Sequence, residues 1–146
     1  MKISTQRVEE LISFLKSLNL GTKYQEEFTN TKIINISYIN ESLTHSSANS
    51  DVNYEKLEFL GDAVLRLIAS DFIKNKFPHM EVGERSELRS HLVSDEWLAH
   101  VGKEINIKSV LFIGQKALRD KSAHLTIQAE STEALIGALY ESWRKI

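Results

Sequence analysis

Apolar residues recur at helical spacing along most of the chain, and this pattern predicts an all-α protein. The longest predicted helix stops at Pro78, since proline cannot continue a helix. A predicted helix over residues 84–103 contains Ser94 and Asp95, which could divide it in two. The β-branched run over 105–113 is compatible with a short strand or with a turn of helix. The other predicted helices span residues 5–18, 37–45, 54–76 and 124–144.

Acidic side chains interrupt the apolar pattern of one predicted helix. Over residues 57–69 the only polar side chains are Glu58, Asp62 and Arg66, at i, i+4 and i+8 on one helical face. A carboxylate in a buried helix is costly unless it is paired or holds a cation. We expect this helix to be buried, and we therefore interpret the acidic face as a metal site.

A second pair of acids lies in the last predicted helix. Glu130 and Glu133 are spaced i, i+3, so they share a face, and an uncharged run follows them. Oxygen ligands suit a hard divalent cation, and we expect Mg²⁺ with Mn²⁺ as a substitute. No Cys occurs in the chain and no His accompanies these acids, which argues against zinc.

Four sequence blocks, in the same order, resemble the ribonuclease III endonuclease family. Residues 55–62 match its hallmark, Glu-Arg/Lys-Leu-Glu-Phe-Leu-Gly-Asp, at every position. Residues 42–47 are similar to its Leu-Thr-His-x-Ser segment, and we interpret His45 as a hydrogen-bonded structural residue. Residues 83–94 and 129–140 resemble the two remaining blocks. The resemblance covers roughly residues 40–140 and implies a single all-α endonuclease domain over residues 1–146 that forms a symmetric homodimer.

The resemblance also implies roles for individual residues. The family's metal ligands fall on Glu58, Asp62, Glu130 and Glu133, of which Asp62 and Glu133 are the expected catalytic pair. Glu55 matches an acid that contacts RNA or ions near the cleft. It is equally compatible with an acid stabilised by the dipole of a helix N-terminus.

The aromatic residue of the hallmark has two readings. Pattern alone would place Phe59 in the core. In the family, this aromatic projects into a pocket of the twin subunit, and we therefore expect a dimer contact. A two-fold dimer would place two metal clusters across one groove, each cutting one strand of a duplex.

The activity implied by the resemblance is metal-dependent cleavage of double-stranded RNA. A-form RNA would be read by shape, through phosphates and 2′-hydroxyls. The expected products carry 5′-phosphates, 3′-hydroxyls and short 3′ overhangs, and the expected role is processing of ribosomal or other structured RNA. The start of the chain is unlike a secretory signal, and no apolar run approaches the ~18 residues of a membrane span. We therefore expect a cytoplasmic protein.

Composition changes this picture little. The chain has 146 residues, a formal net charge of −2 and a pI near 6.2, whereas phosphate binding usually shows as excess base. Bound cations would neutralise the four acids and leave the remainder positive. The tract with Lys116, Arg119 and Lys121 is a candidate phosphate contact, and a solvated surface loop is an equal alternative.

Three features depart from the family. Glu130 stands where the family usually has Asp, which moves the carboxylate by about one C–C bond. Val82 replaces an accessory acid found in many bacterial relatives. The loop 114–126 is about one residue shorter than usual. Full-length bacterial relatives also carry a double-stranded RNA-binding domain after the nuclease domain, so the chain is either a standalone nuclease domain or a piece of a longer protein.

Three alternatives remain open. Asp62 and Glu58 could form a buried cluster with Arg66 and hold no metal, although Glu58 would then stay unpaired. The chain could be a ribonuclease III-like RNA-binding or structural protein without cleavage activity, and the Glu130 departure keeps that alternative open. It could also be a subunit that needs another protein to dock RNA.

Overall fold

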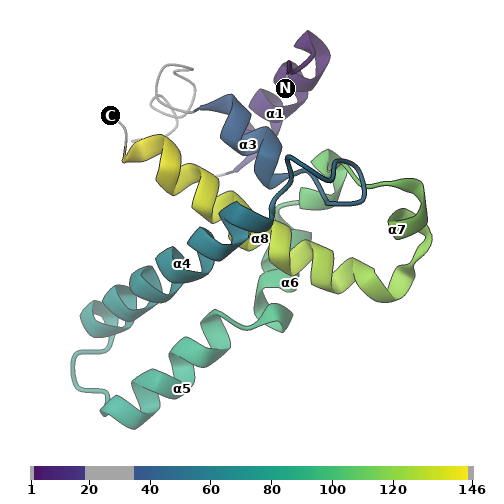
Figure 1. The fold of residues 1–146 in the computed structure, drawn as a ribbon. Coiled ribbons are helices and arrows are strands. Elements are labelled where there is room, and N and C mark those ends of the chain that lie inside the picture. Colours follow the sequence, from purple (N-terminus) through teal and green to yellow (C-terminus); the bar gives the residue numbers. More distant parts are fainter. Residues whose placement is uncertain (1, 19–34, 145–146) are drawn as a thin grey trace.

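Helix α8, His124–Trp143, runs through the middle of the protein, and the other elements pack around it (Figure 1). The computed structural model describes residues 2–18 and 35–144. The surrounding elements are the helices α1 (Thr5–Ser17), α3 (Ile36–Ser42), α4 (Glu55–Lys76), α5 (Val82–Leu92), α6 (Asp95–Glu104) and α7 (Gln115–Arg119), with the 3-10 turns η1 (Ile107–Val110) and η2 (Lys121–Ala123). The protein is all-α, as predicted, and the β-structure of the described residues is limited to one isolated bridge.

Three predicted segments turn out to be divided or partly helical. The span 84–103 forms the two helices α5 and α6, because the Ser94 side chain accepts a hydrogen bond from the Trp97 amide at 3.2 Å and caps a new helix. The ambiguous run 105–113 forms the 3-10 turn η1, and Phe112 then pairs with Thr44 in the single bridge. The segment 114–126, predicted as a loop, contains α7 and η2 and the start of α8.

Two glycines let α4 and α8 cross with their backbones in contact. A Cβ atom on Gly61 would lie 1.8 Å from the carbonyl oxygen of Glu133. A Cβ atom on Gly137 would lie 2.2 Å from the carbonyl oxygen of Leu57. Any larger residue would therefore separate the helices. This crossing brings the acidic stretch of α4 against the acidic stretch of α8.

Helix α8 fits this central position because its buried residues are mostly small. Ala129, Ala134 and Ala138 are fully buried. The buried Ser131 donates a hydrogen bond to the carbonyl of Ile127 at 2.6 Å, so its hydroxyl needs no partner from another element. The helix can therefore be surrounded by α3, α4, α6 and η1 without an unpaired polar group at this position.

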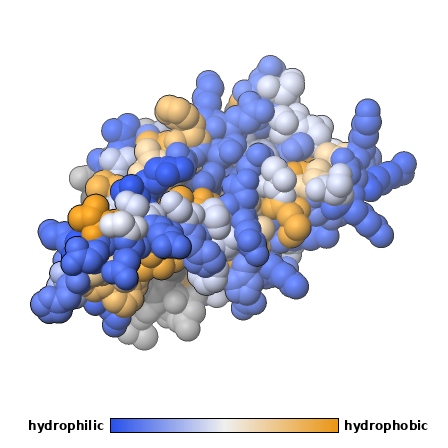
Figure 2. Space-filling view, turned by 90° about the horizontal axis from the view of Figure 1, so that it is seen from below, coloured by the Kyte–Doolittle hydropathy of each residue, from blue (hydrophilic) through white to orange (hydrophobic). Residues whose placement is uncertain are grey.

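The expectation that α4 is buried on most sides is wrong. Phe59 is 85% exposed and Leu67 is 70% exposed, and Ile68 and Phe72 are also exposed. The covered face of α4 meets α8, α5 packs along one flank, and α3 makes a few contacts, whereas no described element covers the side that carries these exposed residues. Figure 2 shows several separate hydrophobic patches among hydrophilic surface on the face of the molecule seen from below. The interpretation that Phe59 lies in the hydrophobic core is therefore excluded for the single chain.

None of the helices in the described part of the chain is both long enough and apolar enough to cross a membrane.

Candidate metal centre

The four predicted metal ligands come from the two helices that cross at the glycines. Glu58 and Asp62 lie one turn apart on α4, and Glu130 and Glu133 lie about one turn apart on α8. Glu133 is buried at 8% exposure, whereas the other three are half-buried. The helix crossing is what gathers the acids, because Gly61 packs directly on the backbone of Glu133.

The charges of these acids interact strongly. Burial, followed by the neighbouring charges of Glu130, Glu55, Asp95 and Asp62, raises the pKa of Glu58 to about 7. Burial also raises the pKa of Glu133 to about 7, with contributions from Asp62, Glu58 and Asp95 that Arg66 opposes. The acids of one helix therefore repel those of the other helix across the crossing. A bound cation would relieve this repulsion.

Two of the four acids already have protein partners. The Tyr54 hydroxyl donates a short hydrogen bond to Oε2 of Glu130, and Tyr54 itself is only 3% exposed. Arg66 Nε donates to Asp62 Oδ1 at 3.1 Å, which is the i, i+4 contact that the sequence suggested as an alternative to metal binding. The other two acids, Glu58 and Glu133, make no hydrogen bond or ion pair with any described residue.

The donor set fits a hard cation, but the side chains do not converge on one point. Four carboxylates offer only oxygen ligands, which Mg²⁺ and Mn²⁺ prefer. Within residues 2–18 and 35–144, no group of three acidic or imidazole side chains is arranged to hold an ion as it stands. Arg66 draws Asp62 along α4, and its side chain is 55% exposed, so it can leave that contact at little cost. Arg66 would have to leave Asp62 before that carboxylate could turn toward an ion.

The predicted basic tract lies apart from the acids. Lys116 and Arg119 are exposed on α7, and Lys121 is exposed on η2, at the end of the molecule where α8 begins (Figure 1). Within the described residues, no hydrogen bond or ion pair joins their side chains to the acids. Glu55 is exposed at the first turn of α4, close enough for its charge to affect Glu58.

Two residues near the acids escaped the sequence analysis. Tyr54 hydrogen bonds Glu130 across 76 positions of sequence, and no local pattern reports a contact of that range. Asp95 is a fifth acid whose charge reaches both Glu58 and Glu133 from the first turn of α6. The sequence had marked Asp95 only as part of a helix break, and the fold of α5 and α6 is what brings it near.

His45 is structural, as predicted. Its Nδ1 atom lies 2.7 Å from the Ser47 hydroxyl, which in turn accepts a hydrogen bond from the Gly114 amide at 2.9 Å. The backbone amide of His45 donates to the carbonyl of Phe112, and its ring packs on Tyr54 with centroids 5.6 Å apart. His45 thus ties the loop before α4 to the segment after η1 and supports Tyr54.

The protein is an all-α domain in which two crossing helices bring four acids near one another, and comparison with known proteins identifies its family. The sequence model of the Ribonuclease-III-like family matches residues 35–142. The chain therefore belongs to this family, as its four sequence blocks indicated.

Curated relatives and solved structures agree with this assignment. A protein named Ribonuclease 3 from Prochlorococcus marinus is 50% identical over 99% of this chain and 58% of its own length. Another, from Legionella pneumophila, is 44% identical over 73% of this chain and 47% of its own length. The chain thus spans about half the length of these relatives. The nuclease domain of ribonuclease III from Campylobacter jejuni matches with a TM-score of 0.70 at 25% identity, covering 97% of this chain and 85% of that one. A second structure of that domain, whose title describes flexibility in a region involved in dimer formation, matches with a TM-score of 0.71 at 24% identity, over 95% and 86% of the two chains.

Proposed function

We propose that residues 1–146 form the nuclease domain of a divalent-metal-dependent endoribonuclease that cleaves double-stranded RNA. The observation that carries the proposal is the meeting of four carboxylates from two helices across a glycine crossing, in a chain of the ribonuclease III-like family. The raised pKa values of Glu58 and Glu133 support it, because they show uncompensated negative charge at the place where a cation would bind.

The proposed ligands of Mg²⁺, or of Mn²⁺ in its place, are Glu58, Asp62, Glu130 and Glu133. A bound divalent ion supplies a water of lowered pKa and offsets charge on the leaving oxygen. Glu133 and Asp62 are the proposed catalytic pair. Gly61 packs on the backbone of Glu133, which fixes where that side chain starts, and the Tyr54 hydroxyl holds one carboxylate oxygen of Glu130.

Hydrolysis requires attack of water on the phosphorus and departure of the 3′ oxygen, which leaves a 5′-phosphate and a 3′-hydroxyl. The acids of this site position the reacting groups, and their own protonation stays low when a cation is bound. Lys116, Arg119 and Lys121 are the proposed phosphate contacts, and Glu55 is a proposed contact at the rim of the cleft. Processing of ribosomal or other structured RNA is the proposed biological role.

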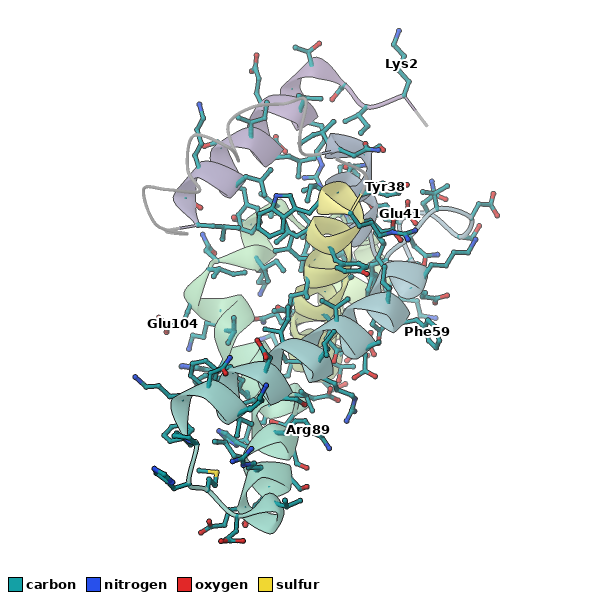
Figure 3. All side chains as sticks on the ribbon, turned by 90° about the vertical axis from the view of Figure 1, so that its left-hand side faces the viewer. Lys2, Tyr38, Glu41, Phe59, Arg89 and Glu104 are labelled. Atoms are coloured by element: carbon teal, nitrogen blue, oxygen red, sulfur yellow. The ribbon has the colours of Figure 1, made fainter. Side chains whose placement is uncertain are left out.

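A homodimer is part of this proposal. Figure 3 shows Phe59 pointing outward from α4, away from the rest of the chain, which suits a contact with a second subunit. An aromatic side chain at 85% exposure is unusual on a monomer and common at an interface. In a two-fold dimer the two acidic sites would face one duplex and cut both strands with a short stagger.

The test is cleavage of a long perfect RNA duplex by the purified chain. We expect short staggered duplex products with Mg²⁺, none with a chelator, and none from Glu133→Gln, which keeps the shape of the side chain but removes its charge. Glu87→Gln, an exposed acid on α5, is the matched control and should cleave normally.

The second candidate is RNA binding without cleavage. It is favoured by the engagement of Asp62 with Arg66 and of Glu130 with Tyr54, which occupies half of the donor set. An intact duplex in both Mg²⁺ and Mn²⁺, together with a gel shift of the same duplex, would support this candidate and refute the nuclease.

A further inference from the structure

A cavity of about 260 Å³ lies at the start of α1, apart from the acids. It is open on one side and is lined by the segment before α1, the first turn of α1, the end of α3 with its following loop, and Phe112. The residues that matter for its chemistry are Lys2, Ser4, Arg7, Asn40, Thr44 and Phe112. No acidic residue lines it, although the chain as a whole is net negative. A cavity of this kind selects for an anion.

Arg7 is the central feature of the cavity wall. It is 8% exposed, and its Nε donates to Asn40 Oδ1 at 2.9 Å while Nη1 reaches Glu10 at 3.4 Å. Its Nη2 atom is buried and has no hydrogen-bond acceptor, and it is the one such side-chain atom within the described residues. A buried guanidinium with unused donors is costly, because each lost hydrogen bond to water goes uncompensated. An oxygen-rich anion would supply the missing acceptor.

Phe112 gives the cavity a flat apolar wall. Its side chain is 56% exposed, and the guanidinium carbon of Arg7 lies 5.1 Å from the centroid of its ring. Its backbone is held by hydrogen bonds to Leu43 and His45, so the ring is presented from a fixed position. Exposed aromatic rings beside cationic side chains are the usual means of holding a nucleotide, since the ring stacks on the base.

We propose that this cavity binds a single nucleotide unit, with its phosphate on Arg7 and its base on Phe112. At about 260 Å³ the cavity is far too small for a duplex, which distinguishes it from the groove of the proposed nuclease. Lys2 extends into solvent beside the cavity (Figure 3), from where its flexible side chain can turn toward a phosphate. Ser4 caps α1 by accepting hydrogen bonds from the amides of Arg7 and Val8, whereas Lys2 and Ile3 precede the helix and form the outer wall of the cavity.

A phosphate joined to a nucleoside could reach this cavity from two sources, a free nucleotide or the phosphorylated end of an RNA strand. The probes are AMP, adenosine, and a short single-stranded RNA with or without a 5′-phosphate. All are titrated into the ¹⁵N-labelled full chain in the presence of a chelator, which keeps nucleotides from binding through a metal at the acids. The Arg7 Nε–H signal and the amides of Ser4, Thr44 and Phe112 report on the cavity.

We expect saturable AMP binding that shifts these signals, with adenosine at least tenfold weaker. Phe112→Ala and Lys2→Ala should each weaken AMP at least fivefold, whereas Lys16→Ala, which removes an exposed lysine at the other end of α1, should have no effect. Arg7 is left unchanged because it joins α1 to α3. Tighter binding of the phosphorylated strand than of AMP assigns the site to an RNA end, and the reverse assigns it to a free nucleotide.

Three results would overturn the proposal. They are the absence of saturable binding by any phosphate-bearing probe, AMP binding unchanged in Phe112→Ala, or equal losses in Lys2→Ala and Lys16→Ala. Because cleavage is not among the readouts, these results would leave the proposed nuclease untouched.

Discussion

Replacing Gly61 by alanine tests the claim that a backbone contact between two helices builds the acidic site. The new Cβ atom would lie 1.8 Å from the Glu133 carbonyl oxygen and 2.7 Å from its carbonyl carbon. It would be about 1.7 Å too close to that oxygen, because carbon makes favourable contacts only near 3.5 Å. Both sides of this overlap are helix backbone at the centre of the fold, so no side chain can rotate away. The helices α4 and α8 must move apart instead.

The magnitude follows from the kind of overlap. Overpacking by side chains typically costs about 1–3 kcal/mol, and a clash with backbone on both sides should cost about 3 kcal/mol or more, even after the gain of about 1 kcal/mol for alanine over glycine in a helix. That is a large fraction of the stability of a typical domain, about 5–15 kcal/mol. Gly83→Ala is the matched control, because nothing lies within 4 Å of its Cβ position. It should leave the protein equally stable or slightly more stable.

Urea unfolding followed by circular dichroism measures both variants. We expect a clearly lower midpoint for Gly61→Ala and an unchanged or higher midpoint for Gly83→Ala, with similar slopes. If Gly61→Ala unfolds at the same urea concentration as Gly83→Ala, the two helices do not touch as described and the account of how the acids are gathered is refuted.

Three further predictions concern the site and the outer face of α4. Without divalent ions, Glu58 and Glu133 have folded pKa values of about 7, above the ordinary 4.5, so the folded state binds more protons than the unfolded state and stability should fall as pH rises from about 5 to about 8. Mg²⁺ should therefore raise the melting temperature at pH 8 and have little effect at pH 5. An equal effect of Mg²⁺ at both pH values would contradict this prediction. Tyr54→Phe keeps the buried ring but removes the hydrogen bond to Glu130, so it should weaken Mn²⁺ binding severalfold by calorimetry while leaving the helix content unchanged. Phe59→Ala should change the stability of the single chain by less than about 0.5 kcal/mol yet shift sedimentation toward monomer, and an unaltered dimer would exclude Phe59 from the contact.

Periodicity was sufficient for the elements and for the acidic faces. The helices near residues 5–18, 54–76 and 124–144 are confirmed, because each has an apolar face long enough to define its period. The i, i+4 and i, i+3 spacing of the acids also places each pair on one face, as found. These features depend on local sequence alone.

Contacts between distant segments could not be predicted in this way. Tyr54 and Glu130 meet only because the helices cross at Gly61 and Gly137. The sequence around a glycine inside a helix does not indicate which other helix packs against it. The exposure of Phe59 was equally hidden, since an apolar residue on a helix has the same pattern whether its own chain or a second subunit covers it. Here the family resemblance supplied an expectation that hydrophobic pattern could not.

The unequal engagement of the four acids suggests how the site would respond to a cation. Asp62 has Arg66 and Glu130 has Tyr54, whereas Glu58 and Glu133 have no such partner among the described residues and carry the raised pKa values. A cation therefore gains most from these last two, and its binding should release protons from them near neutral pH. The exposed Arg66 can then swing away from Asp62, whose carboxylate completes the ligand set at the small cost of one surface ion pair. Tyr54 needs no such rearrangement, since its hydroxyl bonds one oxygen of Glu130 and leaves the other for the ion.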